Sequence, residues 1–264
     1  MPYAISDLLF QALLTLYPFR SGRKKLARFA ASKMSGPVVW QTKDGTRLLL
    51  DLKNYIDREV VIKGGFEASN IDFMCKKIAS YDCDAFIDIG ANIGLYSIAV
   101  ARRTAVQVIA FEPDPRNHCQ MAANLFLNGL DAKVELHEEA VGPSSEEKVL
   151  YAQRDTNNLS TALSRVDRAG EGTIAIKVEA VSLDQKFDLL EGRSVAVKMD
   201  IEGFELEALA GMAKFLKRNR IFLQIEIVPE NRALVRARLA ALGLVELPQL
   251  HQGTADFYFE SADV

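Results

Sequence analysis

A lysine and two carboxylates follow one another at a spacing of two residues within residues 197–203, Val-Lys-Met-Asp-Ile-Glu-Gly. Lys198 and Asp200 have the period of a strand, so their side chains share one face. Charges inside an apolar strand are costly unless they are paired, and such pairs often mark sites that handle protons. We therefore predict Lys198, Asp200 and Glu202 as catalytic residues, with Asp200 as the base. Lys198 is the alternative base if burial lowers its pKa.

Glu226 is expected to end the next strand, so that it faces the same cleft as Asp200 and Glu202. Three carboxylates could hold a divalent cation that acidifies an alcohol. The plainer alternative for the charges on this strand is a structural ion pair with Glu202 or Glu226. None of the three histidines is placed to complete a metal site. We therefore predict no metal ligands.

A second group of candidate residues follows an apolar run, in residues 88–94, Asp-Ile-Gly-Ala-Asn-Ile-Gly. Gly90 and Gly94 allow a tight turn and a close approach of the backbone to a ligand. The turn lacks the middle glycine of GxGxxG, which disfavours a dinucleotide. Asp88 suits a cofactor with a cationic ammonium group, such as S-adenosyl-L-methionine; its structural alternative is an acid that binds the turn amides.

An acid ends the next predicted strand, where Glu112 is followed by Pro113. A carboxylate about 20 residues after a glycine turn can accept hydrogen bonds from both ribose hydroxyls of a nucleoside. Alone, Glu112 could equally be an acid at the N-terminus of the helix that begins near Pro115. Its coincidence with the glycine turn favours cofactor binding.

The elements that must position these residues alternate along the chain. Strands are predicted at 85–89, 107–111, 133–137, 194–199, 221–227, 244–247 and 256–260, and helices at 95–103, 115–128, 204–219 and 230–242. Such alternation predicts a parallel sheet with right-handed crossovers. Between residues 142 and 183 it is interrupted by a polar stretch flanked by strand-like runs at 148–152 and 173–181. Long polar loops in compact domains are often functional.

The N-terminal part has a different pattern. Residues 5–17 are strongly apolar and precede several basic residues, which predicts a helix too short to span a bilayer. We expect it to pack on the catalytic domain or in a homodimer interface; peripheral membrane contact is a less favoured alternative. Strands at 38–41 and 46–52 flank Lys43-Asp44-Gly45, the turn chemistry of a hairpin. Residues 1–81 are thus predicted as a helix and hairpin cap on a catalytic domain of residues 82–264.

Composition excludes several classes of protein. The 264 residues carry a formal net charge of -3, without the basic excess of nucleic-acid-binding proteins. The three cysteines show neither a metal-ligand spacing nor a disulfide framework, so reduced thiols are expected. We expect a cytoplasmic protein that does not bind nucleic acid.

The ordered motifs resemble those of the FkbM family of methyltransferases. They are Gly65-Phe66-Glu67, residues 88–94, Phe111-Glu112-Pro113, Asn124, Ala140-Val141-Gly142, residues 181–184 and residues 198–205. The resemblance implies a Rossmann-like methyltransferase fold in the α/β class, with a mostly parallel seven-stranded sheet flanked by helices. It also implies S-adenosyl-L-methionine as cofactor.

The resemblance also assigns roles. The turn would line the amino-acid and ribose portions of the cofactor, Glu112 would hold the ribose, Glu139 and Ala140 would flank the adenine, and Asp200 would lie beside the transferred methyl group. The complete predicted cofactor set is Glu67, Asp88, Gly90, Ala91, Asn92, Gly94, Glu112, Pro113, Glu139 and Ala140.

The predicted activity is methyl transfer to a hydroxyl of a small molecule, sugar or glycolipid. Two alternatives stay open at this point. One is an NAD-dependent Rossmann oxidoreductase, and the other is a non-catalytic module that binds a cofactor or docks on a membrane.

Overall fold

The computed structural model describes residues 12–13, 20–33, 36–153, 164–167, 169–170, 172–187, 191–250 and 254–262. The helix predicted at residues 5–17 therefore lies outside the described residues, apart from Ala12 and Leu13. None of the described helices is long and apolar enough to cross a membrane.

A seven-stranded sheet forms the centre of the molecule, in the order β12-β13-β11-β10-β3-β4-β5. The strands are β3 (Ala85–Ile89), β4 (Gln107–Phe111), β5 (Val134–His137), β10 (Ser194–Met199), β11 (Arg220–Glu226), β12 (Leu244–Leu247) and β13 (Asp256–Ser261). β13 is antiparallel to both of its neighbours, and the other pairs are parallel. The predicted mostly parallel sheet of seven strands is confirmed.

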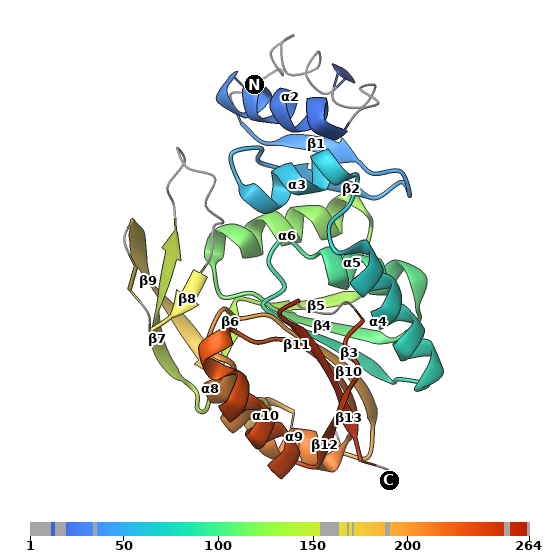
Figure 1. The fold of residues 1–264 in the computed structure, drawn as a ribbon, viewed down its shortest axis with the longest axis vertical. Helices are drawn as coiled ribbons and strands as arrows, with labels where there is room; N and C mark the ends of the chain where they lie inside the picture. Colours follow the sequence, from blue (N-terminus) through green and yellow to red (C-terminus); the bar gives the residue numbers. More distant parts are fainter. Residues whose placement is uncertain are drawn as a thin grey trace.

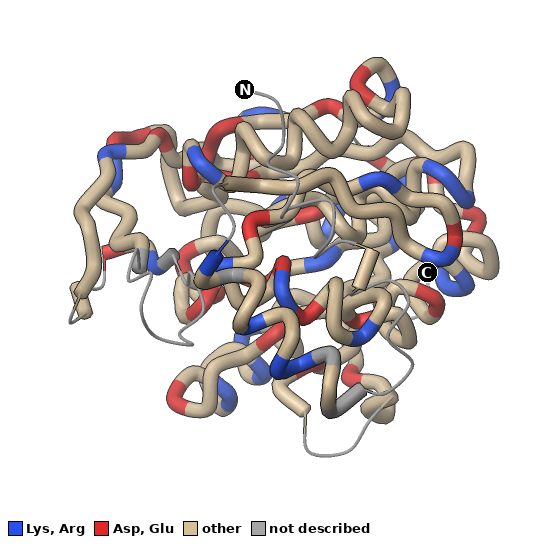
Figure 2. Tube along the Cα trace, turned by 90° about the horizontal axis from the view of Figure 1, so that it is seen from above, with Lys and Arg blue, Asp and Glu red and all other residues tan. Residues whose placement is uncertain are grey.

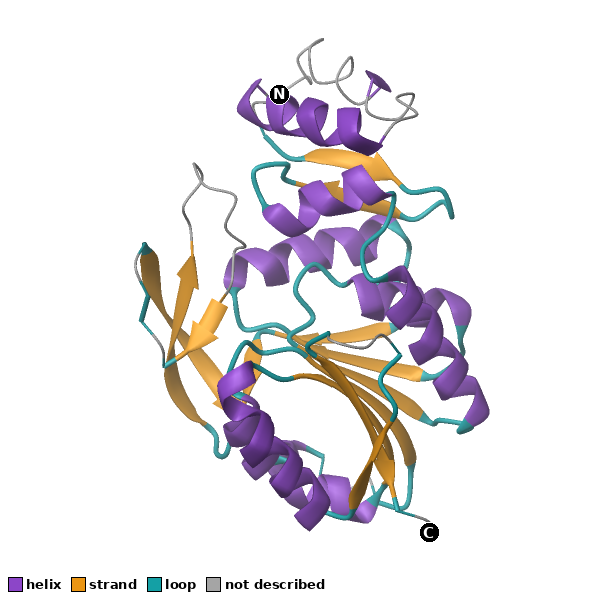
Figure 3. Ribbon diagram, viewed as in Figure 1, coloured by secondary structure: helices purple, strands orange, loops and turns teal. Residues whose placement is uncertain are grey.

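Helices cover both faces of this sheet (Figures 1 and 3). On one side lie α4 (Ala68–Ser80), α5 (Leu95–Arg103) and α6 (Pro115–Leu127); on the other lie α8 (Glu205–Gly211), α9 (Ala213–Arg218) and α10 (Arg232–Ala241). Successive strand residues therefore enter different cores: Phe86 packs in the cluster on the α5 side, and Ile87 in the cluster on the α9 side. Burial on both faces explains why β3 and β10 are almost continuously apolar.

The single helix predicted at 204–219 is wrong, because the chain breaks between α8 and α9 at Met212. A Cβ on Gly211 would lie 1.7 Å from the carbonyl oxygen of Gly142, so only glycine allows this close approach. The hydroxyl of Ser182 donates to the Gly211 carbonyl (2.8 Å), which binds the end of α8 to the neighbouring loop. The helix predicted from residue 230 also begins later, since Pro229–Asn231 form a 3-10 turn (η1) before α10.

The segment expected to be a polar loop contains much of a second sheet. β6 (Glu139–Val141), β7 (Glu146–Gln153), β8 (Ser164–Val166) and β9 (Thr173–Val181) pair in the order β6-β9-β7-β8, and the short α7 (Leu183–Lys186) follows. The two strand-like runs are confirmed as β7 and β9. Their partnership with β6 and β8 was not predicted, because three-residue strands have no periodicity of their own.

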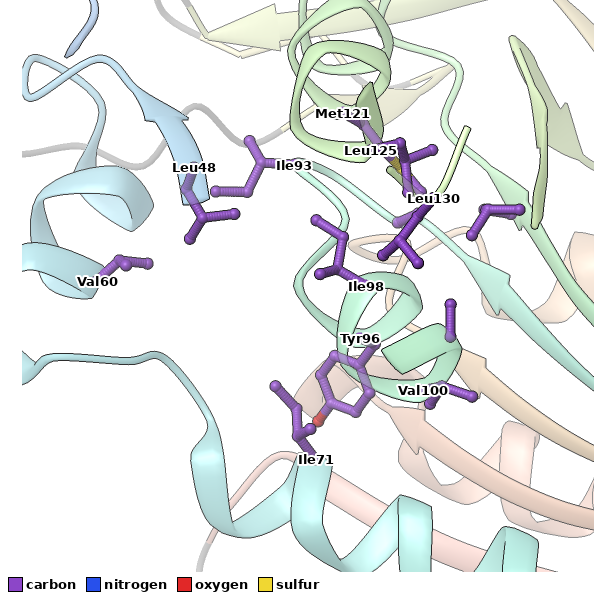
Figure 4. Close-up of a cluster of buried hydrophobic side chains, with 14 of the residues drawn as sticks. Leu48, Val60, Ile71, Ile93, Tyr96, Ile98, Val100, Met121, Leu125 and Leu130 are labelled. Atoms are coloured by element: carbon purple, nitrogen blue, oxygen red, sulfur yellow. The ribbon is translucent and has the colours of Figure 1, made fainter. Parts of the chain in front are cut away.

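The N-terminal part holds the predicted hairpin, β1 (Val38–Gln41) and β2 (Arg47–Leu50), together with α2 (Arg20–Lys33) and α3 (Tyr55–Lys63). Leu48 of the hairpin and Val60 of α3 belong to the same buried cluster as Ile98 of α5 and Met121 of α6, and Figure 4 shows them facing this common interior. One hydrophobic core therefore continues across residue 81, and the division into two domains there stays a prediction.

Candidate functional site

A cleft lies at the carboxyl ends of β3, β4 and β10, with about 690 Å³ of empty volume that is partly open to solvent. Parallel α/β sheets bind their ligands at this edge. The residues that line it are Ile56, Ile89, Gly90, Asn92, Phe111, Glu112, Pro113, Asn117, Glu139, Ala140, Val141, Leu150, Val166, Asp200, Ile201, Glu202 and Phe204. We refer to it as the nucleoside cleft.

Glu112 is fixed in the nucleoside cleft by the backbone. Its side chain accepts the N–H groups of Asn92 (2.7 Å) and Asp114 (2.9 Å), and the residue is only 4% exposed. Burial raises the pKa of Glu112 to about 7, against the lowering effect of these hydrogen bonds. Backbone hydrogen bonds thus fix a buried carboxyl group on the wall of the nucleoside cleft.

The glycine turn and the end of β10 touch each other. Gly90 has φ 79°, and a Cβ there would lie 2.0 Å from the carbonyl oxygen of Asp200. Asn92 has φ 52°, a left-handed conformation that is uncommon for a residue with a side chain and is often found at functional sites. Its Oδ1 atom is buried and has no hydrogen-bond partner within the part of the chain that the structure describes. A ligand with an N–H or O–H group could satisfy it.

A smaller cavity adjoins the nucleoside cleft, with about 380 Å³ of empty volume. The residues that line it are Ile56, Phe66, Glu67, Ala91, Asn92, Ile93, Leu95, Tyr96, Lys198 and Asp200. We refer to it as the lysine cavity. It shares Ile56, Asn92 and Asp200 with the nucleoside cleft, so Asp200 stands where the two meet.

Lys198 is 7% exposed and pairs with Asp200, its Nζ lying 3.2 Å from Oδ2. The same Nζ lies 5.1 Å from the centre of the Tyr96 ring, and the Tyr96 hydroxyl donates to Glu67 (2.8 Å). Burial alone would lower the pKa of Lys198, but the carboxylates of Asp200, Asp88 and Glu67 outweigh it and raise the pKa. The condition under which Lys198 would act as the base is therefore not met.

Glu202 and Glu226 complete an acidic rim next to Asp200. Burial, followed by the charge of Asp200, raises the pKa of Glu202 to about 7. The charge of Asp200, followed by burial, raises the pKa of Glu226 to about 8. Glu226 interacts with the charges of Asp200 and Glu202, but it lines neither the nucleoside cleft nor the adjoining lysine cavity, so the expectation that it faces the same cleft is not met. Arg165 of β8 lies 4.0 Å from Glu202 as a basic neighbour.

Two predicted cofactor residues do not line either cavity. Asp88 is 1% exposed and accepts the N–H (3.1 Å) and the hydroxyl (2.6 Å) of Ser97, so it holds the first turn of α5 behind the glycine turn. Gly94 packs against Met121, to which a Cβ would approach within 2.8 Å. The remaining members of the predicted set all line one of the two cavities: Glu67 and Ala91 the lysine cavity, Asn92 both, and the other predicted residues the nucleoside cleft.

Sequence reasoning missed several residues of the site. Ile56 comes from α3 and Tyr96 from α5, while Leu150 and Val166 come from the second sheet. Asn117 was detectable, because it lies in the first turn of α6, just after the Glu112-Pro113 pair, and its amide is 3.5 Å from the Glu112 carboxyl. No group of three or more His, Cys, Asp or Glu side chains among the described residues has an arrangement that could hold a metal ion.

A glycine turn after a central strand, an acid after the next strand and a cleft at the same sheet edge together define a Rossmann-like α/β protein with a candidate ligand site at that edge. A model of the methyltransferase FkbM domain matches residues 88–242, more than half of the chain. The chain belongs to the FkbM methyltransferase family, and the resemblance seen in the motifs is confirmed.

The chain is similar to several solved structures. The FkbM methyltransferase from Methylobacillus flagellatus KT is 18% identical with a TM-score of 0.47; the match covers 67% of this chain but only 44% of that structure's length. A putative O-methyltransferase from Klebsiella pneumoniae is 12% identical with a TM-score of 0.47, covering 99% and 97% of the two chains. A SAM-dependent O-methyltransferase from Thermotoga maritima is 12% identical with a TM-score of 0.45, covering 90% and 82%. A search of curated proteins gave no match.

Proposed function

We propose that the protein transfers a methyl group from S-adenosyl-L-methionine to a hydroxyl oxygen of a small molecule, sugar or glycolipid. The observation that supports this best is the position of Asp200, between the nucleoside cleft and the lysine cavity and paired with a buried lysine. A carboxylate at that point can reach an acceptor hydroxyl beside the cofactor's reactive group. Membership of the FkbM methyltransferase family favours this reaction over hydride transfer with NAD.

The residues of the two cavities suit the chemistry of this cofactor. When bound, S-adenosyl-L-methionine supplies a methyl group on a positively charged sulfonium. Glu112 offers a fixed acceptor to the ribose hydroxyls, and the unpaired Oδ1 of Asn92 offers another acceptor at the junction of the cavities. The lysine cavity is lined by two carboxyl groups, Glu67 and Asp200, and one ammonium group, Lys198, so its ionised carboxylates leave an excess of negative charge that favours a cationic ligand.

Asp200 is our candidate for the proton acceptor. Lys198 stays protonated because its pKa is raised, so it attracts the Asp200 carboxylate and holds its orientation without removing a proton itself. Glu202 and Glu226, with pKa values of about 7 and about 8, are partly protonated near neutral pH. Their partial protonation limits the repulsion that would otherwise oppose an ionised Asp200.

The test begins with binding and then measures turnover. S-adenosylhomocysteine should raise the melting temperature and NAD should not. Hydroxylated metabolites and glycosides are then screened for release of S-adenosylhomocysteine. With a responsive acceptor, Asp200→Asn should lower the rate by roughly 10²–10⁴-fold, the usual contribution of general base catalysis. Its affinity for S-adenosylhomocysteine should change far less.

Asp131→Asn is the matched control, because Asp131 is exposed and lines neither cavity. It should leave both rate and affinity unchanged. Near-normal turnover by Asp200→Asn would reject its role as the base. Stabilisation by NAD with no effect of S-adenosylhomocysteine would reject the proposed function as a whole.

A further inference from the structure

A basic cavity lies in the N-terminal part, between α2 and α3, and has about 520 Å³ of empty volume. Its lining residues are Lys24, Arg28, Tyr55, Arg58, Glu59 and Ile62. Ile56, on the same helix α3, lines both the nucleoside cleft and the lysine cavity. One helix, about 10 Å in diameter, therefore separates the basic cavity from the cofactor site, and the two are distinct.

The charges around this cavity are not balanced. Lys24 and Arg28 lie four residues apart on α2, on one face of that helix, and Arg58 adds a third cation from α3. The one carboxylate among the lining residues, Glu59, pairs outside this set with Lys63 at 2.8 Å. The sequence of α2 contains basic residues and no acid, and in the view from above, where α2 lies nearest, basic positions follow this helix (Figure 2).

The guanidinium group of Arg58 has a buried donor without a hydrogen-bond acceptor among the described residues. The residue is 6% exposed, and its Nη1 donates to the carbonyl oxygen of Leu52 (2.9 Å). Its Nη2 has no hydrogen-bond partner within the described part of the chain. Burial, and then the charge of Arg28, lower the pKa of Arg58 against the raising effect of Glu59, Tyr55 and Asp57, so Arg28 on α2 and Arg58 on α3 repel each other. Buried guanidinium groups usually have all their donors paired.

We propose that the basic cavity is an anion site that binds a phosphate group. A guanidinium presents a planar fork of donors that matches phosphate oxygens, and a lysine adds a point charge. The Tyr55 hydroxyl, which also belongs to the lining, can donate a further hydrogen bond. A bound phosphate would offset the repulsion between Arg28 and Arg58 and accept the free donor of Arg58. The phosphate comes from an anionic lipid headgroup or from a free phosphate-bearing molecule.

The experiment uses the full chain and two probes at constant ionic strength. Calorimetric titration with inorganic phosphate detects a free ligand. Co-sedimentation with phosphatidylcholine vesicles, with and without phosphatidylglycerol, detects a headgroup. Arg28→Gln should weaken binding of the responsive probe at least tenfold. Lys25→Gln is the control, because it removes one charge from the same helix at a residue outside the cavity lining. It should change the affinity for the same probe less than threefold.

Each result assigns or rejects the site. Binding of inorganic phosphate that is lost in Arg28→Gln identifies a free ligand, and binding to phosphatidylglycerol vesicles alone identifies a headgroup. Equal weakening by the two variants would show a diffuse attraction to the basic helix, which would overturn the proposed site. Failure of both probes to bind would also overturn it. If Arg28→Gln does not fold, Lys24→Gln replaces it. Affinity for S-adenosylhomocysteine, measured in parallel, tests the proposed function separately, since the basic cavity contains no residue of the cofactor site.

Discussion

Glu112 has two roles at the level of single residues: it accepts backbone N–H groups that shape the glycine turn, and it faces the nucleoside cleft. The sequence could predict the second role from the spacing of a strand-end acid after a glycine turn. It could not predict the first, because the N–H of Asn92 comes into reach only when β3 and β4 are neighbours in the sheet. Burial of Glu112 in the folded protein also raises its pKa. Ligand binding that needs the ionised carboxylate should therefore depend on pH.

Affinity for S-adenosylhomocysteine should rise with pH, because ribose hydroxyls donate best to an ionised Glu112. With a pKa of about 7, the ionised fraction increases about tenfold from pH 6 to pH 8, and the apparent Kd should fall by up to that factor. Calorimetric titrations across this range measure the effect. Glu112→Gln keeps the size of the side chain and should give weaker binding with a flat profile. A flat profile in the unmodified protein would contradict the ribose assignment.

Lys198 shows where sequence reasoning about a single residue reached its limit. Strand period placed it on one face with Asp200, and the ion pair confirms that placement. The sign of its pKa change could not be predicted, because it depends on Asp88 and Glu67 as well, and Glu67 comes from a loop far away in the sequence. Because the charges of three carboxyl groups act on one ammonium group, we expect the lysine to be needed for the stability of the fold.

Lys198→Met should therefore destabilise the fold as well as impair catalysis. It leaves the buried Asp88 and the half-buried Glu67 and Asp200 without their cation, and removing one partner of a buried pair costs roughly 3–5 kcal/mol. Urea denaturation measures the loss in the free energy of unfolding. Lys214→Met, at an exposed position of α9, is the matched control and should change the free energy by less than about 0.5 kcal/mol. An equally small effect of Lys198→Met would show that the carboxylates do not depend on the lysine.

Among the elements, the strands of the central sheet were the most predictable. β3, β4 and β10 have the predicted bounds, because strands buried on both faces are almost continuously apolar. The break after α8 and the pairing of β6 and β8 were not predictable, since both depend on contacts with distant segments, such as Gly211 against Gly142. The glycine turn is the element on which the site depends most.

Gly90→Ala should disrupt the turn and the end of β10 together. The new Cβ would meet the Asp200 carbonyl at 2.0 Å, and φ at this position is 79°, a conformation that strains any residue with a side chain. We expect a loss of at least about 2 kcal/mol in stability and loss of measurable binding to S-adenosylhomocysteine. Gly36→Ala is the control, because Gly36 has no heavy atom within 4 Å of a new Cβ and is not among the positive-φ glycines. Normal cofactor binding by Gly90→Ala would contradict the tight contact.

At the level of the whole molecule, the N-terminal part contributes to both the cofactor site and the core. Ile56 and Glu67 line the cavities, and Leu48 and Val60 pack with residues of α5 and α6. The sequence predicted this part as a separate cap, since apolar patterning shows which residues are buried but not against which partner they pack. The parallel sheet was easier to predict, because its topology alone brings the strand ends together.

Buried carboxyl groups are a property of this whole assembly, and they set its pH dependence. The pKa values of Asp57, Glu112 and Glu202 are raised to about 7 and that of Glu226 to about 8, with burial as the first cause for the first three and the charge of Asp200 for Glu226. These pKa values exceed the ordinary values of 3.8 for Asp and 4.5 for Glu, so the folded state binds protons more tightly than the unfolded chain. The stability that this contributes is present below the unfolded values and is lost as pH rises through about 7 to 8.

The free energy of unfolding should therefore fall by at least about 2 kcal/mol between about pH 5 and about pH 8.5, as measured by urea denaturation. Asp57→Asn tests the origin of this slope, because Asp57 is fully buried outside both cavities and an amide cannot ionise. The variant should have a shallower slope and unchanged affinity for S-adenosylhomocysteine, whereas Asp131→Asn, at an exposed position, should keep the original slope. A stability that rises with pH over this range would mean that the buried carboxyl groups are ionised and paired in the folded protein, and it would remove the basis for a partly protonated acidic rim around Asp200.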